Sequence, residues 1–167
     1  MPQDLKRTKT PEQALTTLMA LCAKAERSTD DARRLLRRWG VAEPDAEKVI
    51  GTLVAQRFID DRRYAEAFVR DKMRFSNWGV FKIRSALNMK RIDRDIIAEV
   101  LDACSGEDSG RRLEETLRRK MRSIKAKDSY DRKVKLMRYG LSLGYEMEEV
   151  GDTVDKLIRS WEETNGE

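Results

Sequence analysis

The sequence has 167 residues, a formal net charge of +5 at pH 7, 39% charged residues and 7% aromatic residues. This length suits one domain or a few small repeats. The high share of charged residues, with only three prolines, favours helices over a sheet. With no histidine and two cysteines, the chain lacks the usual ligands of a four-coordinate zinc site. It also lacks P-loop, dinucleotide-binding and nucleophile-elbow motifs. We therefore expect no metal, no cofactor and no enzymatic activity, although catalysis by carboxylates alone is not excluded.

The location of the protein and its cysteines can also be predicted. No run of 18 apolar residues occurs, and the first ten residues lack the apolar stretch of a signal peptide. We expect a soluble, cytoplasmic monomer with no membrane partner. Cys22 and Cys104 each lie in an apolar segment of helical period, where reduced and buried thiols are favoured over a disulfide between them.

Apolar residues recur at helical spacing throughout the chain, without the alternation typical of strands. Pro11 is expected to begin a helix over 11–26. Ser28 then caps a second helix that Gly40 ends, and Pro44 begins a third. The same order follows twice more, with helices predicted near 61–75, 79–89, 94–103, 109–126, 129–141 and 146–162.

Three turns relate these groups of helices. The segments "WGV" (39–41), "KRI" (90–92) and "LGY" (143–145) lie 51 and 53 residues apart. This period predicts an all-α fold of three tandem three-helix repeats. The expected domains are residues 1–58, 59–104 and 105–167. The segment "CSGEDSG" (104–110) is the predicted flexible joint.

Two adjacent carboxylates, Asp60 and Asp61, stand at the start of a predicted helix and could serve either catalysis or structure. As N-cap, Asp60 would accept free backbone N–H groups, and Asp61 would lie in the positive first turn. Ile59 and Tyr64 would form a hydrophobic staple, with Tyr64, Ala65, Phe68 and Val69 as a buried stripe. Neighbouring helix residues diverge by about 100°, so the pair is a poor metal site. We interpret both aspartates as structural.

Charge is distributed unevenly along the chain. Residues 111–138 hold twelve lysines and arginines against four acidic residues, whereas 139–167 hold two against eight. The middle helix of each predicted repeat is basic and the closing helix is acidic. Complementarity to helix dipoles and solvated faces can explain any one helix. Recurrence in three repeats favours a basic stripe that binds a partner, namely Arg33, Arg34, Arg37, Arg38, Lys82, Arg84, Arg132, Lys133 and Lys135.

Three-helix units with a glycine turn also suggest a DNA-reading helix-turn-helix motif. In that motif the helix after the turn enters the major groove, but here those helices are the acidic ones, which phosphates would repel. Base-specific control of transcription is therefore disfavoured. Trp39 and Trp78 could stack on bases, but each flanks a turn, where an aromatic residue that closes the core is the favoured interpretation.

Three segments resemble a known family. They are "RSTDDARRLLRRWGV", "LVAQRFIDDRRYAEAFVRDKMR" and "WGVFKIRSALNMKRID", of which the "FIDDRRYA" block is the most specific. They are similar to the motifs of RecX, the regulatory protein of the RecA recombinase. The resemblance covers residues 26–103 well and the third repeat weakly. Arg91 replaces the usual turn glycine, and Gly140 stands where a leucine is expected.

The resemblance implies an elongated, curved array of three repeats. It implies binding in the groove of the RecA filament on single-stranded DNA, with inhibition of ATP hydrolysis, strand exchange and coprotease function in recombination, DNA repair and the SOS response. A sequence-nonspecific DNA-binding protein that acts without RecA is the alternative. A nucleic-acid enzyme that uses Asp60 and Asp61 is a distant third.

Overall fold

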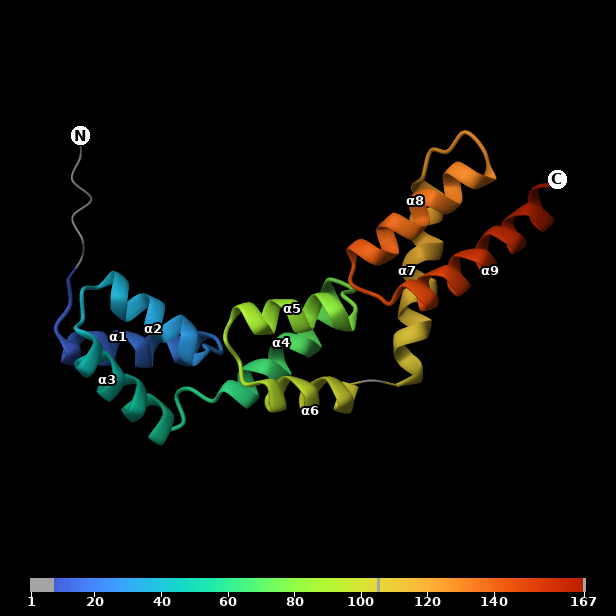
Figure 1. The fold of residues 1–167 in the computed structure, drawn as a ribbon. Coiled ribbons are helices and arrows are strands. Elements are labelled where there is room, and N and C mark those ends of the chain that lie inside the picture. The colour runs from blue at the N-terminus through green and yellow to red at the C-terminus, as the bar shows by residue number, and fades with distance from the viewer. Residues whose placement is uncertain (1–7, 105, 167) are drawn as a thin grey trace, which may run out of the picture. The chain divides into compact units, whose positions relative to one another are not determined.

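The computed structural model describes residues 8–104 and 106–166, and all regular elements within these residues are helices (Figure 1). In chain order they are α1 (Pro11–Lys24), α2 (Thr29–Arg38), α3 (Glu43–Ala55), α4 (Asp61–Phe75), α5 (Val80–Met89), α6 (Arg94–Cys104), α7 (Glu107–Ser123), α8 (Ser129–Ser142) and α9 (Met147–Asn165). The predicted all-α fold of three-helix repeats is confirmed. The largest differences from the predicted ranges lie at the ends of α1, α7 and α9, and helix ends in general fray.

The turn between the second and third helix of each repeat has one backbone conformation. Gly40, Arg91 and Gly144 have φ values of 71°, 55° and 90°, all in the left-handed region. In each turn the N–H of the following residue donates to the carbonyl five residues earlier, which is the hydrogen bond of a Schellman motif. The following residue is buried each time, and these residues are Val41, Ile92 and Tyr145. The alignment of the three turns made from the sequence is therefore confirmed.

Local signals account for the helix starts in the first repeat. The Thr10 and Ser28 side chains accept a hydrogen bond from the backbone N–H of the third helical residue. The side chains of those third residues, Gln13 and Asp31, in turn accept a hydrogen bond from the backbone N–H of Thr10 and Ser28. These are capping boxes. Pro44 lies at the second position of α3, one residue later than predicted. Proline suits this first turn because its missing N–H has no intrahelical partner there.

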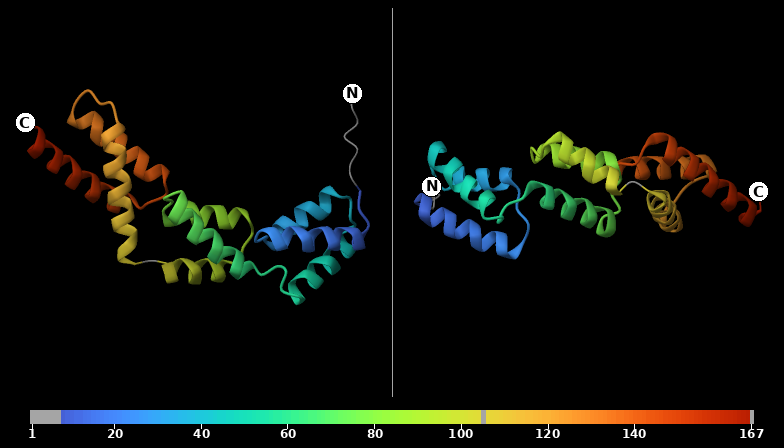
Figure 2. Two further views of the ribbon diagram at one scale, coloured as in Figure 1. Left: turned by 180° about the vertical axis from the view of Figure 1, so that it is seen from behind. Right: turned by 90° about the horizontal axis from the view of Figure 1, so that it is seen from below.

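The chain divides into two compact units, of which the first comprises Met1–Phe68 and Leu87–Val100. The helices α1, α2 and α3 pack together (Figure 2). The core lies between them, where Leu18, Leu36 and Leu53 are fully buried. Burial of each such side chain contributes about 1.5–3 kcal/mol before the cost of chain entropy. Trp39 packs partly buried against this core, as the core-closing interpretation expected.

The second unit comprises Val69–Ala86 and Leu101–Glu167. Its core lies between α7, α8 and α9, with Leu117, Leu136 and Val154 fully buried. Gly140 of α8 is buried against Val150, since a Cβ at this position would lie 2.6 Å from Val150 Cγ1. This close approach of α8 and α9 explains why a glycine stands where the family pattern has a leucine.

Backbone hydrogen bonds join α5 to the turn between α8 and α9. Gly79 N–H donates to the Leu143 carbonyl at 2.7 Å, and Phe81 N–H donates to the Gly144 carbonyl at 3.0 Å. The first N–H groups of a helix lack intrahelical partners, so these two carbonyls satisfy donors that would otherwise need water or a side chain. A Cβ on Gly79 would lie 2.4 Å from the Gly144 oxygen, and one on Gly144 would lie 2.3 Å from Lys82 Cβ. Both positions therefore require glycine.

Two predictions about the second joint and the cysteines need correction. The joint is shorter than 104–110, because α6 extends to Cys104 and α7 begins at Glu107; Ser105 lies outside the described residues. The prediction that both thiols are buried was wrong for Cys104, which is exposed at the last position of α6. Cys22 is partly buried, and burial raises the pKa of its thiol. Both cysteines are free, as predicted. None of the described helices combines the length and apolar character needed to cross a membrane.

Gly79→Ala should destabilise the protein by about 1–3 kcal/mol, because its Cβ would overlap a backbone oxygen that cannot rotate away. Thermal unfolding followed by circular dichroism measures the effect. Gly151→Ala is the matched control: Gly151 lies inside α9 with open space around its would-be Cβ. There the substitution should stabilise by about 0.5–1 kcal/mol. Equal melting temperatures for Gly79→Ala and the wild type would contradict the proposed close contact.

Candidate functional site

The two carboxylates at the start of α4 bind backbone rather than converge on one point. Asp60 Oδ1 accepts the N–H of Arg63 at 3.1 Å, so the predicted N-cap is confirmed. Asp61 Oδ1 accepts the N–H of Thr29 at 2.8 Å. Thr29 is the first residue of α2, so Asp61 satisfies a free N–H of a helix in the preceding repeat.

Arg63 joins the same two repeats through its guanidinium group. Its Nε donates to Glu26 at 2.7 Å, and Nη2 donates to the carbonyls of Arg57 and Phe58 at 3.1 and 3.3 Å. The hydrogen bond to Glu26 raises the pKa of this guanidinium above its already high value. The sequence analysis missed this role, although Arg63 belongs to the conspicuous "FIDDRRYA" block.

Behind this polar start, three of the four residues of the predicted apolar stripe of α4 are buried, and the fourth, Phe68, is partly buried. Ile59, Tyr64, Ala65 and Val69 are buried, and the Tyr64 and Phe68 rings stack with centroids 6.0 Å apart. Burial raises the pKa of the Tyr64 hydroxyl, with a further contribution from the charge of Asp31. The structural interpretation of Tyr64 and Phe68 agrees with this packing and stays a prediction.

A second ionic contact joins α2 to the turn after α5. Lys90 Nζ donates to Asp31 Oδ1 at 2.6 Å, and the Asp31 side chain is only 15% exposed. Burial by itself would raise the pKa of this carboxyl group. Hydrogen bonds from Lys90 and from Ser28 outweigh that effect and hold the pKa below its ordinary value. Asp31 is therefore ionised at neutral pH and fixes Lys90 against α2.

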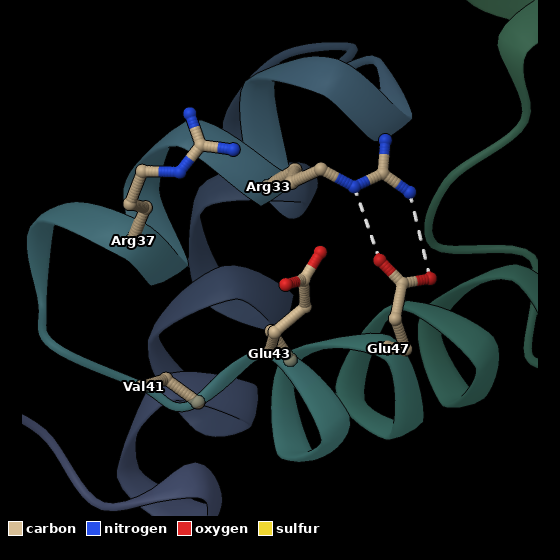
Figure 3. Close-up of a pocket in the computed structure, with 6 residues that line it drawn as sticks. Arg33, Arg37, Val41, Glu43 and Glu47 are labelled. Atoms are coloured by element: carbon tan, nitrogen blue, oxygen red, sulfur yellow. Dashed lines mark hydrogen bonds and ion pairs between the residues drawn. The ribbon is translucent and has the colours of Figure 1, made fainter.

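The basic residues of α2 project from the first repeat in a cluster. Arg33 Nε and Nη2 donate to Glu47 of α3 at 3.1 and 3.5 Å (Figure 3). Arg34 pairs with Asp30 at 3.0 Å. Arg37 and Arg38 are both exposed, and neither forms an ion pair within the residues that the structure describes.

Two shallow pockets border this cluster. In one of them Glu43 points toward the space between Arg37 and the Arg33–Glu47 pair, and Val41 lies at the edge (Figure 3). The other pocket lies along α2 and the turn after α5. Its lining residues are Asp30, Arg33, Arg34, Arg37, Met89 and Arg91.

The basic residues of α5 lie beside aromatic rings. The Lys82 ammonium lies 4.5 Å from the centre of the Trp78 ring and donates to the Ser142 carbonyl at 3.3 Å. Lys72 lies on the same ring at 4.6 Å, so Trp78 contacts two cations as well as closing a turn. Arg84 lies 5.8 Å from the centre of the exposed Phe81 ring.

The basic residues of α8 make contacts inside the third repeat. Arg132 lies 4.6 Å from the centre of the Trp161 ring and donates to the Met121 carbonyl at 3.2 Å. Lys133 pairs with Asp155 of α9 at 2.6 Å, and Lys135 pairs with Asp131 at 2.9 Å. Lys135 also donates to the Lys125 carbonyl at 2.6 Å.

These contacts explain part of the charge pattern read from the sequence. The pairs Arg33–Glu47 and Lys133–Asp155 each join a basic middle helix to the acidic closing helix of the same repeat. Exposed pairs of this kind contribute only about 0–1 kcal/mol, so they do not by themselves require the arginines. The basic side chains also keep donors that face solvent. Their role in binding a partner stays a prediction.

Metal chemistry has no support in the geometry. The described part of the chain contains no group of three or more cysteine, aspartate or glutamate residues placed to hold a metal ion. Asp60 and Asp61 are committed to separate backbone donors. The expectation that the protein is not an enzyme stays a prediction.

Fold and surface together define an all-α protein of tandem three-helix repeats that carries basic side chains on its middle helices. Family models for the second and third three-helix domains of RecX match residues 60–101 and 107–153. A regulatory protein RecX from Chlorobium phaeobacteroides (strain BS1) is 30% identical over 149 residues, which cover 89% of this chain and 96% of that protein. The chain belongs to the RecX family.

Other relatives carry the same name. A regulatory protein RecX from Clostridium botulinum (strain Eklund 17B / Type B) is 32% identical over 121 residues, but the match covers only 56% of that longer protein. The crystal structure of RecX from Lactobacillus salivarius superposes with a TM-score of 0.73 at 20% identity, covering 89% of this chain and 96% of that one. The structural likeness supports the fold.

Asp60→Ala should lower the free energy of unfolding by about 0.5–2 kcal/mol, the usual cost of a lost N-cap. Asp60→Asn keeps an acceptor and should recover most of this loss. Glu66→Ala, on an exposed position of the same helix, should change stability by less than about 0.5 kcal/mol. Urea unfolding measures all three. A fully stable Asp60→Ala variant that lost its binding activity would restore a functional role for this carboxylate.

Proposed function

We propose that this protein regulates the RecA recombinase by binding the RecA filament on single-stranded DNA and inhibiting it. The inhibited activities are ATP hydrolysis, strand exchange and the coprotease function in the SOS response. The observation that carries the proposal is membership of the RecX family, with matches to two of its three-helix domains. The protein acts by occupying the filament and catalyses no reaction.

The basic surface gives this proposal a physical mechanism. A RecA–DNA filament presents phosphates and acidic side chains, and long-range attraction by arginine and lysine speeds encounter with such a partner. Once docked, a guanidinium group can pair bidentately with a phosphate or carboxylate. Arg37 and Arg38 are exposed and have no ion pair in the described residues, so pairing with the filament breaks no ion pair there.

The nine basic residues of the stripe contribute unequally in this mechanism. Arg33, Arg34, Lys133 and Lys135 already have a carboxylate partner, so binding must compete with that pair or share its donors. Lys82 and Arg132 each donate to a backbone carbonyl. Arg84 is exposed beside an exposed aromatic ring. We therefore assign the larger contribution to Arg37, Arg38 and Arg84. The smaller contribution comes from the residues with an internal partner, namely Arg33, Arg34, Lys82, Arg132, Lys133 and Lys135.

The wild-type protein should inhibit RecA ATP hydrolysis on single-stranded DNA. Replacement of Arg33, Arg34, Arg37 and Arg38 by glutamine should raise the half-maximal inhibitory concentration at least about tenfold, equivalent to 1.4 kcal/mol. Replacement of Lys82 and Arg84 should act in the same direction. Inhibition by the wild type should weaken as salt rises, and less steeply in the variants.

The control variant replaces four exposed basic residues outside the stripe, Lys24, Lys48, Arg70 and Arg94. This control loses four positive charges, as does the variant in which the four arginines of α2 are replaced. It should inhibit RecA ATP hydrolysis more strongly than the α2 variant does. Melting temperatures check that each variant is folded. If the stripe and control variants inhibit equally, the stripe is only a solvated face, and the segment 111–138 becomes the first alternative contact.

A second candidate function, DNA binding without RecA, is favoured by the aromatic side chains near the start of α5. Phe75 and Phe81 are 73% and 50% exposed, and the guanidinium groups of Arg74 and Arg84 lie 5.4 and 5.8 Å from their ring centres. Exposed rings beside cations suit single-stranded nucleic acid, since bases stack on the rings and phosphates pair with the cations.

Binding to a fluorescent oligo-dT, naked or coated with RecA, separates the two candidates. A filament regulator binds the coated DNA more tightly, and the difference persists as salt rises. If Phe75 and Phe81 stack on bases, their double replacement by alanine weakens binding to naked DNA by roughly tenfold or more. Tyr130→Ala is the control, because Tyr130 is 76% exposed in α8 and lies outside this group of side chains. Equal losses in both variants would rule out stacking at Phe75 and Phe81.

A further inference from the structure

Arg91 has a backbone conformation that arginine does not favour. Its φ is 55°, and the equivalent turns of the other two repeats have glycine at this position, Gly40 and Gly144. A left-handed conformation costs an L-residue about 1–2 kcal/mol, whereas glycine adopts it freely. The turn itself therefore does not account for the arginine.

The Arg91 side chain lies at a pocket formed mainly by other arginines. Arg33, Arg34 and Arg37 line this pocket from α2, and Asp30 and Met89 complete it. Four arginines and one aspartate line the pocket, and the carboxylates of Glu47 and Asp31 lie beside Arg33 and Arg34 outside the lining. Met89 is 81% exposed, so it provides an apolar rim to an otherwise cationic site.

Carboxylates hold two of the four guanidinium groups, those of Arg33 and Arg34, and lie near that of Arg91. The Asp30 side chain, only 11% exposed, lies 3.0 Å from Arg34 Nη2 and 4.0 Å from Arg91 Nε. The carboxylate of Glu47, on α3, accepts two hydrogen bonds from the Arg33 guanidinium group. Each guanidinium group has five N–H donors, and these contacts use only one or two of them. The remaining donors are available to an anion, and less side-chain freedom is lost when it binds.

We propose that this pocket binds a phosphate oxyanion. Phosphate oxygens accept several hydrogen bonds at once, and a guanidinium group matches two of them in plane. The inference deepens the proposed function and rests on it for the source of the phosphate, which is the backbone of single-stranded DNA. The Met89 rim then lies against the sugar or base next to the bound phosphate.

Arg91 allows a test in which loss of binding cannot result from loss of folding. Arg91→Gly removes one guanidinium group from the pocket and also removes the backbone strain, so the variant should melt at or above the wild-type temperature. Arg57→Gly is a matched control. Arg57 is exposed, has a φ of 60°, and lies in the turn before α4, away from the pocket. Both variants therefore lose the same side chain from the same backbone conformation.

The measurement is the anisotropy of a fluorescent oligo-dT, without RecA, over a range of salt concentrations. Arg91→Gly should raise the Kd about tenfold and reduce the salt slope by about 1, as the loss of one phosphate contact predicts. Arg57→Gly should leave the Kd within about twofold of wild type once the general effect of one charge is allowed for. Equal Kd values for the two variants would overturn the proposal.

Inorganic pyrophosphate distinguishes a small phosphate ligand from the DNA backbone. If pyrophosphate at low concentration displaces the oligonucleotide from the wild-type protein but not from Arg91→Gly, the pocket is a site for free phosphates. Binding of DNA that depends on Arg91, without such competition, identifies the backbone. A poly-glutamate peptide tests for an acidic protein surface instead. If Arg91→Gly weakens binding of this peptide but leaves DNA binding unchanged, the phosphate assignment is wrong and the pocket binds an acidic protein surface.

RecA ATP hydrolysis, measured in parallel, separates failure of the pocket from failure of the proposed function. If DNA binding depends on Arg91 but the wild-type protein leaves RecA unaffected, the pocket stands and RecA regulation is wrong. If the wild type inhibits RecA while Arg91→Gly and Arg57→Gly bind DNA equally, regulation stands and the pocket assignment is wrong.

Discussion

The structure depends first on one turn conformation, which ends the middle helix of every repeat. A residue in the left-handed region lets the chain close two hydrogen bonds onto the preceding helix and buries the next apolar side chain, as at Gly40 and Val41. The third helix can then pack on the other two. Glycine occupies this position twice at no steric cost, and the repeat that lacks it carries Arg91 at the edge of a cationic pocket.

The contacts that join successive repeats within each unit use helix termini. In the first unit Asp61 satisfies the first N–H of α2, and Lys90 reaches Asp31. In the second unit the free N–H groups at the start of α5 reach the carbonyls of Leu143 and Gly144. Helix ends carry unsatisfied backbone groups, so pairing them serves stability and register together. Of the two adjacent carboxylates, Asp61 joins the repeats in this way, whereas Asp60 caps its own helix. The function proposed above is therefore placed on the basic surface.

The basic side chains therefore perform two tasks. Some neutralise the acidic helix beside them, as Arg33 does with Glu47, and some project into solvent without an ion pair in the described residues, as Arg37 and Arg38 do. A paired arginine is still a donor, because a carboxylate uses only part of its guanidinium group. Internal pairing can thus orient a side chain for a partner. In the proposed regulator of RecA, the same acidic residues that reduce the net charge also fix the geometry of the cations that bind.

The sequence by itself determined the helices, their caps and the period of the repeat, since these depend on residues a few positions apart. Ser28, Asp60 and the aligned turns were read correctly for this reason. The tertiary structure alone decided the long-range contacts. It paired Asp61 with Thr29, left Cys104 exposed, set Gly140 against Val150 and brought Arg91 to the arginines of α2. Residues on different helices meet only after the helices have packed, and no local pattern records which of them will be in contact.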